Sequence, residues 1–561
     1  MTYSEVNNMS SGAQLFVDSL RRLGIEEIFT LVGDHLNEAL SRAAAAGLRI
    51  IDMRHESGVT HAADVFARAR RRPAVSLVTG GPGHTNSLTG IATAYLMGSP
   101  LIAVSGAAPL AAAGRQVFQV IDQVGMAAPV VKWCAQASTP AQVPYLLGRA
   151  YNEAAAGRMG PVHLSIPVDV FGGETNAPSP LPQPLPAAAP APAARDIGRA
   201  LAILRAAERP VVIAGSGVWW AGAGRQLRRF LNRTKLPHYS IAMGRGIVSD
   251  EHRYAMGYAD PALNRAAIRA FREADAVLIL GKRLDGRLAL GGAKLFDPRA
   301  KFIQTDIHPQ ELGHNRPLVV GICAGLGATL EAMNAATGKE PWKARRAWLG
   351  RQRAWRDEWR AELAARAAER GPHLHPAAFF FELCRHLPDC LYSWDGGDFV
   401  HWGRCILPAT RPGGWMRLGP LATIGAGLPN AVGLQLANPN ERVLMMTGDG
   451  SLGFYLAELD TLVRHNLPVV IIVGNDAGWG VERELQGAIQ GTTVACELRR
   501  TRYDLVMKAL GGEGENIESL RQVGPAIRRA FASGKPYLLN VNIRPARSPF
   551  SEWAIRRKKG A

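Results

Sequence analysis

A repeated alternation of short apolar runs with stretches of helical periodicity constrains this chain more than any other feature. In the first third of the sequence, apolar runs stand at residues 27–31, 50–53, 74–78, 101–105 and 162–166. Segments with helical spacing, such as Ala13–Leu23 and Leu36–Ala46, separate them. Because short strands without polar alternation are buried on both faces, these runs predict a parallel sheet covered by helices on both sides.

The same alternation returns twice further along the chain. Strands are predicted at residues 211–214, 276–280 and 301–306, and again at 443–447, 469–473 and 537–541. The Pro- and Ala-rich segment Asn176–Arg195 is typical of a stiff connector, and Pro341–Arg370 has the spacing of a connecting helix. We therefore predict an α/β chain of three doubly wound parallel-sheet domains. The predicted parts are an N-terminal domain (11–175), a linker (176–195), a central domain (196–340), a helical linker (341–372), a C-terminal domain (373–545) and a basic tail (546–561).

Composition narrows the class of protein. Hydrophobic residues make up 47% of the 561 residues and charged residues 20%, which excludes a disordered chain. The net charge of +18 raises the alternative of nucleic-acid binding. The arginines are scattered, however, and only Arg68–Arg72 and Arg556–Lys559 form local runs, without interleaved aromatic residues. We interpret the charge as solvated helix faces, or as a general attraction for anionic cofactors and substrates, and expect no nucleic-acid partner.

Cysteine usage and the chain start indicate a compartment. None of the six cysteines belongs to a C-x-x-C pair, so neither a zinc site nor a disulfide framework is indicated. Residues Met1–Ser11 are polar and lack the apolar core of a signal peptide. No apolar run approaches the ~18–20 residues of a membrane span. We expect a cytoplasmic protein with no membrane partner.

The strongest chemical signal is a strand–helix–strand unit near the end of the third series. The strand Val443–Thr447 runs into Gly448–Asp449–Gly450–Ser451, and a predicted helix follows from about Leu452 to His465. The next strand ends in Gly474–Asn475–Asp476–Ala477–Gly478. Because neighbouring parallel strands end at the same sheet edge, Asp449 and Asn475 are expected to lie close together, where α/β sheets bind ligands.

The residue types in this unit suit a diphosphate and a divalent metal. Gly448 and Gly450 allow close backbone approach, and the helix beginning near Ser451 offers free N–H groups to an anion. Mg²⁺ prefers oxygen ligands, which the Asp449 carboxylate, the Asn475 amide and the backbone carbonyl of Ala477 can supply. A tight β-turn at 448–451 with no ligand is the alternative. The second half of the pattern, at a workable spacing, argues against it.

These residues resemble the thiamine-diphosphate (ThDP) motif of the acetolactate synthase–pyruvate decarboxylase superfamily. The resemblance extends over nearly the whole chain and implies a pyrimidine-binding, a central and a diphosphate-binding domain, in that order. It implies ThDP and Mg²⁺ as cofactors, with Gly397, Asp398 and Phe399 also helping to hold the diphosphate. It further implies a homodimer or homotetramer, because superfamily members place the cofactor between two subunits.

The same resemblance assigns an activating acid. Arg54–His55–Glu56 matches the superfamily segment whose glutamate stands beside the aminopyrimidine ring, so Glu56 is expected to drive cofactor deprotonation. A surface glutamate at a helix start is the alternative. The turn Gly80–Gly83 resembles the Gly-Pro-Gly turn near the cofactor, which assigns Gly81 and Gly83 to cofactor binding. His84, which follows the turn, is equally compatible with reaching the site and with a role outside it.

Three further positions carry the resemblance. Gln119 lies in a segment that lines the site from the pyrimidine side and is expected to hydrogen-bond a substrate oxygen; the residues from 126 to 133 that follow look close to benzaldehyde lyase. The Ala422 carbonyl is expected to accept from the aminopyrimidine, and Ile424 to wedge between the two cofactor rings. Helix packing at Gln119 and ordinary core packing at Ile424 are the alternatives.

His35 discriminates among superfamily members. Acetolactate synthases usually carry a small residue here, whereas benzaldehyde lyase and some 2-hydroxyacyl-CoA lyase-like members carry a histidine. A histidine there would shuttle the proton of a substrate hydroxyl or alkoxide. Its alternative is a polar residue that caps the helix predicted over Leu36–Ala46.

The resulting interpretation is a ThDP- and Mg²⁺-dependent carbon–carbon lyase or carboligase. It would act on 2-hydroxyketones, 2-oxo acids or 2-hydroxyacyl thioesters through an enamine, with Glu56, His35 and Gln119 as catalytic residues. The alternatives are an acetolactate synthase subunit that condenses pyruvate and a 2-hydroxyacyl-CoA lyase whose C-terminal tail touches an acyl-CoA. Residues 281–287 resemble the flavin-binding central domain of acetolactate synthases, so FAD stays an unassigned alternative cofactor. A non-catalytic regulator built on this fold is the alternative from another class.

Overall fold

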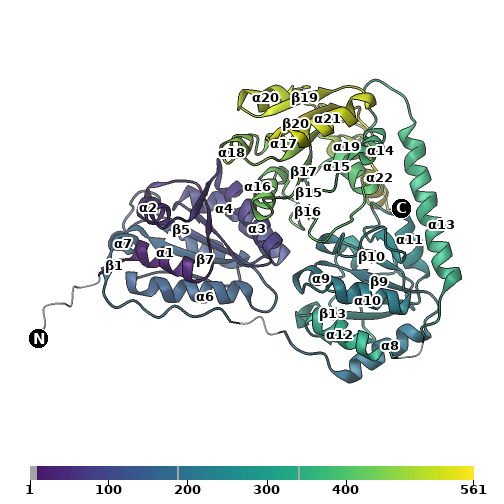
Figure 1. Ribbon diagram of the computed structural model, residues 1–561, viewed down its shortest axis with the longest axis horizontal. Coiled ribbons are helices and arrows are strands. Elements are labelled where there is room, and N and C mark those ends of the chain that lie inside the picture. Colours follow the sequence, from purple (N-terminus) through teal and green to yellow (C-terminus); the bar gives the residue numbers. More distant parts are fainter. Residues whose placement is uncertain (1–8, 186–188, 339–340, 561) are drawn as a thin grey trace, which may run out of the picture. The chain divides into compact units, whose positions relative to one another are not determined.

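Three six-stranded parallel sheets make up the computed structural model, which describes residues 9–185, 189–338 and 341–560 (Figure 1). The chain forms two compact units. The first unit consists of the N-terminal part up to residue 185 together with residues 418–443 and 453–469, and the second contains the rest of the described chain. The predicted fold class, an α/β chain of three doubly wound sheets, is confirmed.

The first sheet belongs to the first unit and has the strand order β3-β2-β4-β5-β7-β6. Its strands are β2 (Glu27–Thr30), β3 (Arg49–Asp52), β4 (Ala74–Val78), β5 (Leu101–Ala107), β6 (Cys134–Gln136) and β7 (Val162–Pro167). The helices of this unit are α1 (Gly12–Arg22), α2 (Asn37–Ala45), α3 (Glu56–Arg70), α4 (Pro82–Met97), α5 (Gln123–Ala127), α6 (Val143–Ala155), α7 (Val168–Gly172), α16 (Gly427–Ala437) and α18 (Glu458–Arg464). Strands β1 (Ser10–Ser11) and β8 (Glu174–Thr175) form a separate antiparallel pair.

The second unit holds the other two sheets. The central sheet has the order β11-β10-β9-β12-β13-β14, with β9 (Pro210–Ala214), β10 (His238–Ser240), β11 (Ala255–Tyr258), β12 (Ala276–Leu280), β13 (Lys301–Asp306) and β14 (Val320–Cys323). The C-terminal sheet has the order β16-β15-β17-β18-β20-β19, with β15 (Leu391–Trp394), β16 (Trp415–Arg417), β17 (Val443–Gly448), β18 (Val470–Asn475), β19 (Glu513–Ile517) and β20 (Tyr537–Asn542).

Helices cover these two sheets and connect them. They are α8 (Ala194–Ala206), α9 (Ser216–Trp220), α10 (Gly224–Thr234), α11 (Arg265–Glu273), α12 (Leu326–Ala336), α13 (Arg346–Ala367), α14 (Pro376–His386), α15 (Asp398–Ile406), α17 (Asp449–Gly453), α19 (Gly480–Gln490), α20 (Tyr503–Ala509), α21 (Leu520–Ala532) and α22 (Pro549–Lys558). Figure 1 shows the long helix α13 running beside both sheets of this unit.

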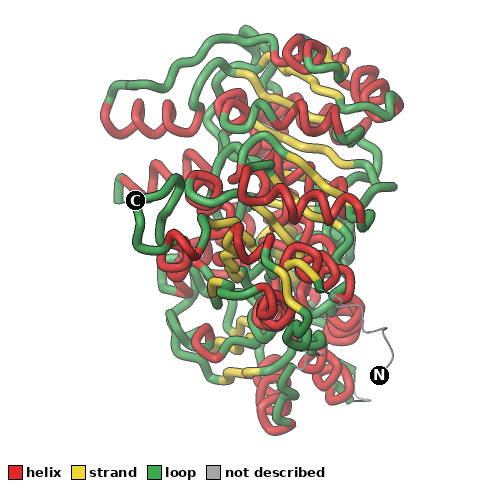
Figure 2. The backbone as a smooth tube through the Cα atoms, turned by 90° about the vertical axis from the view of Figure 1, so that its left-hand side faces the viewer, coloured by secondary structure: helices red, strands yellow, loops and turns green. Residues whose placement is uncertain are grey.

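Burial explains why the strands read as unbroken apolar runs. Every residue of β4, β9 and β12 is buried, because helices cover both faces of each sheet. Figure 2 shows strands flanked by helices on both sides. Each sheet has its own large hydrophobic cluster of buried side chains.

Two predicted segments differ in the structure. The helix predicted from about Leu452 to His465 is two helices, α17 and α18, separated by a turn. The turn leaves Phe454 exposed and packs Tyr455 against Leu418 and Ala426. The second is the basic tail, for which no element is predicted and which contains α22. Ser548 caps that helix by accepting a hydrogen bond from the Ser551 N–H.

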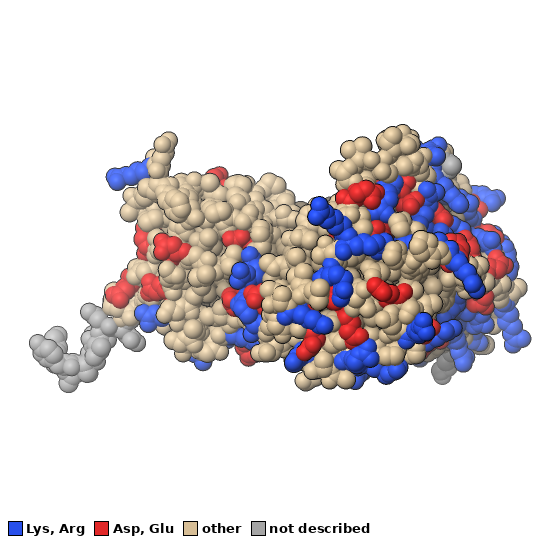
Figure 3. All heavy atoms as spheres, turned by 90° about the horizontal axis from the view of Figure 1, so that it is seen from above, with Lys and Arg blue, Asp and Glu red and all other residues tan. Residues whose placement is uncertain are grey.

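Surface charge is distributed as the sequence indicates. Figure 3 shows Lys and Arg intermixed with Asp and Glu on the right-hand part of that face. On α13, Arg351 pairs with Glu273, and Glu358 pairs with Arg269. Such pairs are typical of solvated helix faces. Among the described helices, none is long and apolar enough to cross a membrane.

Buried histidines predict a dependence of stability on pH. Burial lowers the pKa of His238, at the start of β10, to about 3. The unfolded chain therefore takes up a proton near pH 6.5 while the folded chain does not, so this contribution is present above pH ~6.5 and is lost as the pH falls toward 3. Between pH 7 and pH 5 the loss is about 2 kcal/mol for one such group.

We expect His238→Phe to reduce the acid sensitivity, because Phe fills the buried position without titrating. The measurement is thermal unfolding at pH 7 and pH 5 for both proteins. The fall in midpoint between the two pH values should be smaller in the variant. An equal fall in both proteins would show that His238 contributes nothing to acid destabilisation.

Candidate active site

Glu56 is the first residue of helix α3 and is nearly buried, with 9% of its surface exposed. The helix begins here because the His55 side chain accepts a hydrogen bond from the Ser57 N–H at 3.1 Å, which caps the helix. The Asn86 side chain donates to Glu56 Oε2 at 3.0 Å. The surface-glutamate alternative is therefore wrong, because the carboxylate is enclosed and held at one oxygen.

Residues far away in the sequence hold the start of α3, and sequence reasoning did not find them. The Tyr455 hydroxyl lies 2.6 Å from Ser57 Oγ. The buried Glu458 carboxylate accepts from the Arg54 N–H at 3.2 Å and from the Thr461 hydroxyl at 2.6 Å. Burial raises the pKa of Glu458. Glu458 lies within the strand–helix–strand unit, but its burial and its hydrogen bonds appear only in the structure.

The Gly80–Gly83 turn lies directly against Glu56. A Cβ atom on Gly83 would stand 2.8 Å from Thr79 Cγ2 and 3.6 Å from Glu56 Oε1. A Cβ atom on Gly81, whose φ is +62°, would stand 2.8 Å from Gln119 Cβ. Only glycine permits this approach. The turn thus brings Glu56 and Gln119 to its two sides.

Gln123 organises the same turn from beneath, and sequence reasoning missed its role. It is buried, accepts from the Gly81 N–H at 3.1 Å, and donates to the Gly106 carbonyl and to Ser165 Oγ, each at 3.0 Å. Gln119, the glutamine that was predicted, is only partly buried and faces the turn from the loop before α5. The two glutamines therefore differ in position: Gln123 supports the turn by hydrogen bonds, and Gln119 packs against Gly81 from the loop before α5.

His35 lies in a short 3-10 turn, Asp34–Leu36, and makes no helix-capping hydrogen bond. Its Nδ1 is 2.9 Å from Thr79 Oγ1 and accepts from the Gly80 N–H at 3.4 Å. Since the N–H can only donate, Nδ1 is the acceptor and Nε2 carries the proton. Burial lowers the pKa of His35, so the ring is neutral near pH 7. His35 contacts Thr79, and Thr79 and Glu56 both lie against Gly83, so the three side chains lie around one glycine turn.

The segment Ala422–Gly425 belongs to the same unit as Glu56. Ile424 packs against Leu418, Ala426 and Tyr455, the residue that also contacts Ser57 beside Glu56. The Tyr455 side chain therefore contacts both Ile424 and the start of α3.

His84 is completely buried rather than directed to an open site. Its ring centroid lies 4.5 Å from that of His163, whose Nε2 is 2.7 Å from Ser105 Oγ. Burial lowers the pKa of His84 to about 4 and that of His163 well below its usual value. Both rings are neutral packing partners behind the turn.

The second group of predicted residues lies in the other unit, at the carboxyl ends of β17 and β18. Gly448 and Gly474 are paired in register on these strands, which places Asp449 and Asn475 at one sheet edge. Asp449 is buried, and its Oδ2 accepts from the Gly478 N–H at 3.0 Å. The predicted juxtaposition of the two strand ends is therefore present.

The amide of Asn475 has one orientation. Its Nδ2 donates to the Thr501 carbonyl at 2.8 Å and to Asn540 Oδ1 at 3.1 Å, so both hydrogens are used. Within the described part of the chain, its Oδ1 accepts one bond, a long one from the Ala477 N–H at 3.3 Å. The Ala477 carbonyl accepts from the Leu498 N–H at 2.8 Å and keeps one lone pair. Asn475 therefore presents oxygen, not nitrogen, as its free ligand atom.

Two glycines leave open space beside Asp449. A Cβ atom on Gly397 would have no neighbour closer than 4.0 Å, the distance to Gly448 Cα, and one on Gly448 would have none closer than the Gly396 carbonyl at 4.0 Å. Gly450, in contrast, lies against Trp479, because a Cβ atom on it would stand 2.8 Å from the ring. Ser451 is buried, and its Oγ donates a hydrogen bond to the Gly396 carbonyl at 3.5 Å.

Asp398 and Phe399 start helix α15, and their side chains are engaged with other residues of the unit. Asp398 is buried and accepts hydrogen bonds from the Ser548 and Ser551 hydroxyls, and burial raises its pKa to about 6. The Phe399 ring packs on Phe380 at 4.7 Å between centroids. Their backbone N–H groups stand at the helix start, where an anion can be bound.

Left-handed backbone conformations mark several of these positions. Gln119, Ala422 and Ala477 have φ values of +59°, +58° and +56°, which non-glycine residues rarely adopt. Such conformations cluster at functional sites because the surrounding structure has to hold them. This backbone signal is independent of the side-chain chemistry that pointed to the same residues.

Three family models match the chain in order, and each covers most of the strands of one sheet. They are the thiamine pyrophosphate enzyme N-terminal domain over residues 10–126, the central domain over 197–333 and the C-terminal domain over 395–541. The chain belongs to the thiamine pyrophosphate enzyme family. Thiamine pyrophosphate is ThDP, so the two groups of residues fall in the family's two cofactor-binding domains, and the protein is a ThDP-dependent enzyme.

Several relatives match nearly the whole chain. Acetolactate synthase large subunit IlvG of Mycobacterium tuberculosis is 35% identical over 95% of this chain and 96% of its own length. Human 2-hydroxyacyl-CoA lyase 1 is 27% identical over 95% of both chains. Oxalyl-CoA decarboxylase of Escherichia coli is 28% identical over 97% of this chain and 96% of its own length. The thiamine pyrophosphate enzymes similar to this one thus include a synthase, a lyase and a decarboxylase.

The donor set of this family member fits a diphosphate with Mg²⁺. Asp449 and Asp476 are close carboxyls whose pKa values are raised by burial and, for Asp476, by the charge of Asp449. A divalent cation would relieve that repulsion. No cluster of three or more His, Cys, Asp or Glu residues that could hold a metal ion occurs among the described residues. Asp449, Asn475 and the Ala477 carbonyl match the oxygen preference of Mg²⁺.

Proposed function

We propose that this enzyme is a ThDP- and Mg²⁺-dependent lyase or carboligase that breaks or forms the carbon–carbon bond of 2-hydroxyketones. Related 2-oxo acids are included as substrates. The observation that carries the proposal is the position of His35. It is buried, neutral and linked through Thr79 to the turn that also touches Glu56.

Bound ThDP would supply a nucleophilic carbon and hold the electron pair released when the carbon–carbon bond breaks. Glu56 is suited to exchange a proton with the cofactor ring, because Asn86 holds one oxygen and the other faces the glycine turn. Gly397, Gly448 and the backbone at the start of α15 would hold the diphosphate. Asp449 and Asn475 would bind its Mg²⁺.

His35 and Gln119 would manage protons on the substrate oxygen. A neutral imidazole with Nε2–H can donate to an alkoxide and recover the proton from a hydroxyl. Thr79 and the Gly80 N–H keep Nδ1 as the acceptor, which fixes that tautomer. Gln119 lies over the same turn and would orient the oxygen by a hydrogen bond.

An acetolactate synthase that condenses pyruvate is the second candidate. The identity of 35% to the mycobacterial acetolactate synthase supports it. A 2-hydroxyacyl-CoA lyase is supported by the match to the human enzyme of that name, at lower identity. His35 favours the 2-hydroxyketone reaction over pyruvate condensation, because acetolactate synthases usually carry a small residue there.

The experiment that tests the proposal is a substrate panel on the ThDP- and Mg²⁺-loaded enzyme, with pyruvate, benzoin, short acyloins and a 2-hydroxyacyl-CoA. We expect acyloin cleavage to have the highest kcat/KM, and aldehyde release is measured directly. Acetolactate formation from pyruvate as the fastest reaction would replace the proposal by its second candidate. A flavin absorbance spectrum in the purified protein would point the same way.

His35→Ala should slow acyloin cleavage by about 100-fold or more, the range of one positioned acid–base group. Exchange of the cofactor's acidic carbon-bound proton should change little, because Glu56 governs it. Cleavage is followed by aldehyde release and exchange by NMR. Unchanged cleavage in a folded variant would return His35 to a packing role.

The superfamily resemblance also supports a homodimer or homotetramer with the cofactor held between subunits. Light scattering on the purified protein measures the mass in solution.

A further inference from the structure

A row of amide side chains crosses the C-terminal sheet from Asn475. Asn475 ends β18, Asn540 lies in β20 and Asn516 lies in β19, and these are neighbouring strands. Asn475 and Asn540 are buried, with 0% and 1% of their surface exposed, and Asn516 is partly buried. Inner strands of a parallel sheet are usually apolar, so each buried amide there has to be matched by hydrogen-bond partners.

Each amide of this row donates to the oxygen of the next one. Asn475 Nδ2 donates to Asn540 Oδ1 at 3.1 Å, and Asn540 Nδ2 donates to Asn516 Oδ1 at 2.7 Å. Asn516 Nδ2 in turn donates to the exposed carboxylate of Glu518 at 2.9 Å. All donors of the amide row therefore point away from the metal-anchor end, and all acceptor oxygens point toward it.

The carboxylate at the outer end fixes the direction of the amide row. An ionised carboxylate has no hydrogen to donate, so Asn516 turns its Nδ2 to Glu518 and its Oδ1 to Asn540. The same requirement passes through Asn540 to Asn475, whose Nδ2 also donates to the Thr501 carbonyl. Reversal of the Asn475 amide would set its Oδ1 against two other oxygens, which would both lose their donor. Asn475 Oδ1 is thereby kept as the free ligand atom.

We propose that Asn540, Asn516 and Glu518 are positioning residues that orient Asn475 as a magnesium ligand. They act through Asn475, and their role rests on the Mg²⁺ site proposed above. Partners of metal ligands contribute about 10–100-fold to metal affinity, because they fix the orientation of the ligand before the metal binds.

The test is the Mg²⁺ affinity of the full-length enzyme at a saturating ThDP concentration, measured by calorimetric titration. Asn540→Leu keeps the size of the side chain and removes the acceptor for Asn475, so we expect Mg²⁺ to bind about tenfold more weakly. In an Asn475→Asp background the same change should cost less than about threefold, because a carboxylate has an oxygen at both positions and needs no partner to orient it. A loss of equal size in both backgrounds would indicate a loosened sheet and would overturn the proposal.

Two variants of Asn516 follow the amide row outward. Asn516→Asp still accepts from Asn540 and should keep the Mg²⁺ affinity within about twofold of wild type, whereas Asn516→Leu should lower it several-fold. Equal affinities in these two variants would overturn the role of the row beyond Asn540. Asn542→Leu is the matched control. Asn542 also donates to Asn516 and Glu518, at 3.4 and 3.3 Å, but the row does not pass through it, so its replacement should leave Mg²⁺ affinity unchanged.

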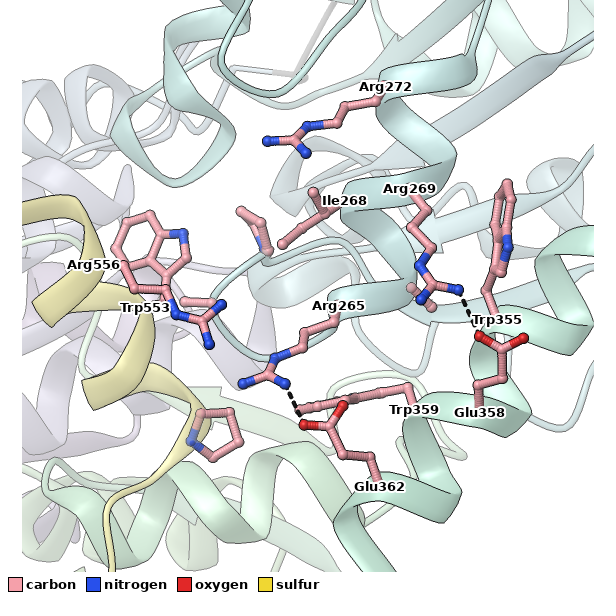
Figure 4. Close-up of a pocket in the computed structure, with 14 residues that line it drawn as sticks. Arg265, Ile268, Arg269, Arg272, Trp355, Glu358, Trp359, Glu362, Trp553 and Arg556 are labelled. Carbon is pink, nitrogen blue, oxygen red and sulfur yellow. Dashed lines mark hydrogen bonds and ion pairs between the residues drawn. The ribbon is translucent and has the colours of Figure 1, made fainter. Parts of the chain in front are cut away.

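Two further variants separate the ways in which the proposal can fail. Trp359→Leu loosens the same unit outside the amide row. Trp359 lines the cavity between α11, α13 and α22 (Figure 4) and belongs to the hydrophobic cluster that contains Leu539 and Val541 of β20. This change should lower the thermal midpoint and leave Mg²⁺ affinity unchanged. Asp449→Asn tests the magnesium site itself. Unchanged affinity in Asp449→Asn would overturn the site and the row together, whereas a loss there beside an unchanged Asn540→Leu would overturn the row alone.

Discussion

Replacing Glu56 by Gln is expected to lower turnover by at least about 100-fold while ThDP binding changes by less than about threefold. The physical reason is that the carboxylate exchanges a proton and the amide cannot, and one acid–base group contributes about 10²–10⁴-fold. Asn86 already holds one oxygen of Glu56, and the glycine turn encloses the other, so the isosteric amide fits the same space. The measurements are kcat on the best substrate and ThDP affinity by titration.

Glu458→Gln is the matched control for this variant. Glu458 is also a buried glutamate that contacts the start of α3, but it accepts from the Arg54 N–H instead of facing the glycine turn. We expect this change to lower the thermal midpoint more, and kcat less, than Glu56→Gln does. Wild-type turnover in Glu56→Gln would remove Glu56 from the mechanism.

Asp449→Asn is expected to weaken Mg²⁺-dependent ThDP binding by about 100-fold or more. The change removes the only anionic ligand proposed for the metal and leaves two neutral oxygens, and even the partners of metal ligands contribute about 10–100-fold to affinity. Trp479 provides the readout, because its ring lies against Gly450, the residue next to Asp449. Quenching of tryptophan fluorescence is recorded against Mg²⁺ at a saturating ThDP concentration.

Asp476→Asn separates this role from general charge. Asp476 is the neighbouring carboxyl, whose pKa the charge of Asp449 helps to raise; it lies 3.4 Å from Arg483 and is no proposed ligand. Its replacement should leave Mg²⁺-dependent binding within a few-fold of wild type. An equal loss in both variants would mean that the loop binds the cofactor through its total negative charge and not through one ligand.

The strands of the three sheets were predictable because their signal is local. Residues 74–78, 276–280 and 301–306 are strands in the structure with the predicted bounds, since burial on both faces makes each run uniformly apolar. Periodicity did not predict the break between α17 and α18, where Tyr455 packs against Leu418, a residue distant in the sequence. The helical order of the C-terminal tail also depends on tertiary contacts, namely those of Ser548 with Asp398.

Some features of the candidate site were predictable from the sequence, and others appear only in the structure. Sequence pattern pointed to Asp449 and Asn475, and the register of β17 with β18 accounts for their proximity. Pattern did not distinguish the two glutamines of one short segment. Gln119 lies over the glycine turn, whereas Gln123 supports it by hydrogen bonds to Gly81 and Gly106. Spacing alone cannot show which side of a loop a side chain occupies.

The sequence by itself determined the fold class and the pairing of an acidic with an amide residue at adjacent strand ends, because both follow from periodicity and from residues next to a strand. Only the tertiary structure decided the surroundings of the two proposed proton-transfer residues. Glu56 is enclosed by Asn86 and the glycine turn, its helix is held by Glu458, and His35 is oriented by Thr79. These contacts join residues from 30 to 404 positions apart. The burial that they create also lowers the pKa of His35 and keeps its ring neutral near pH 7.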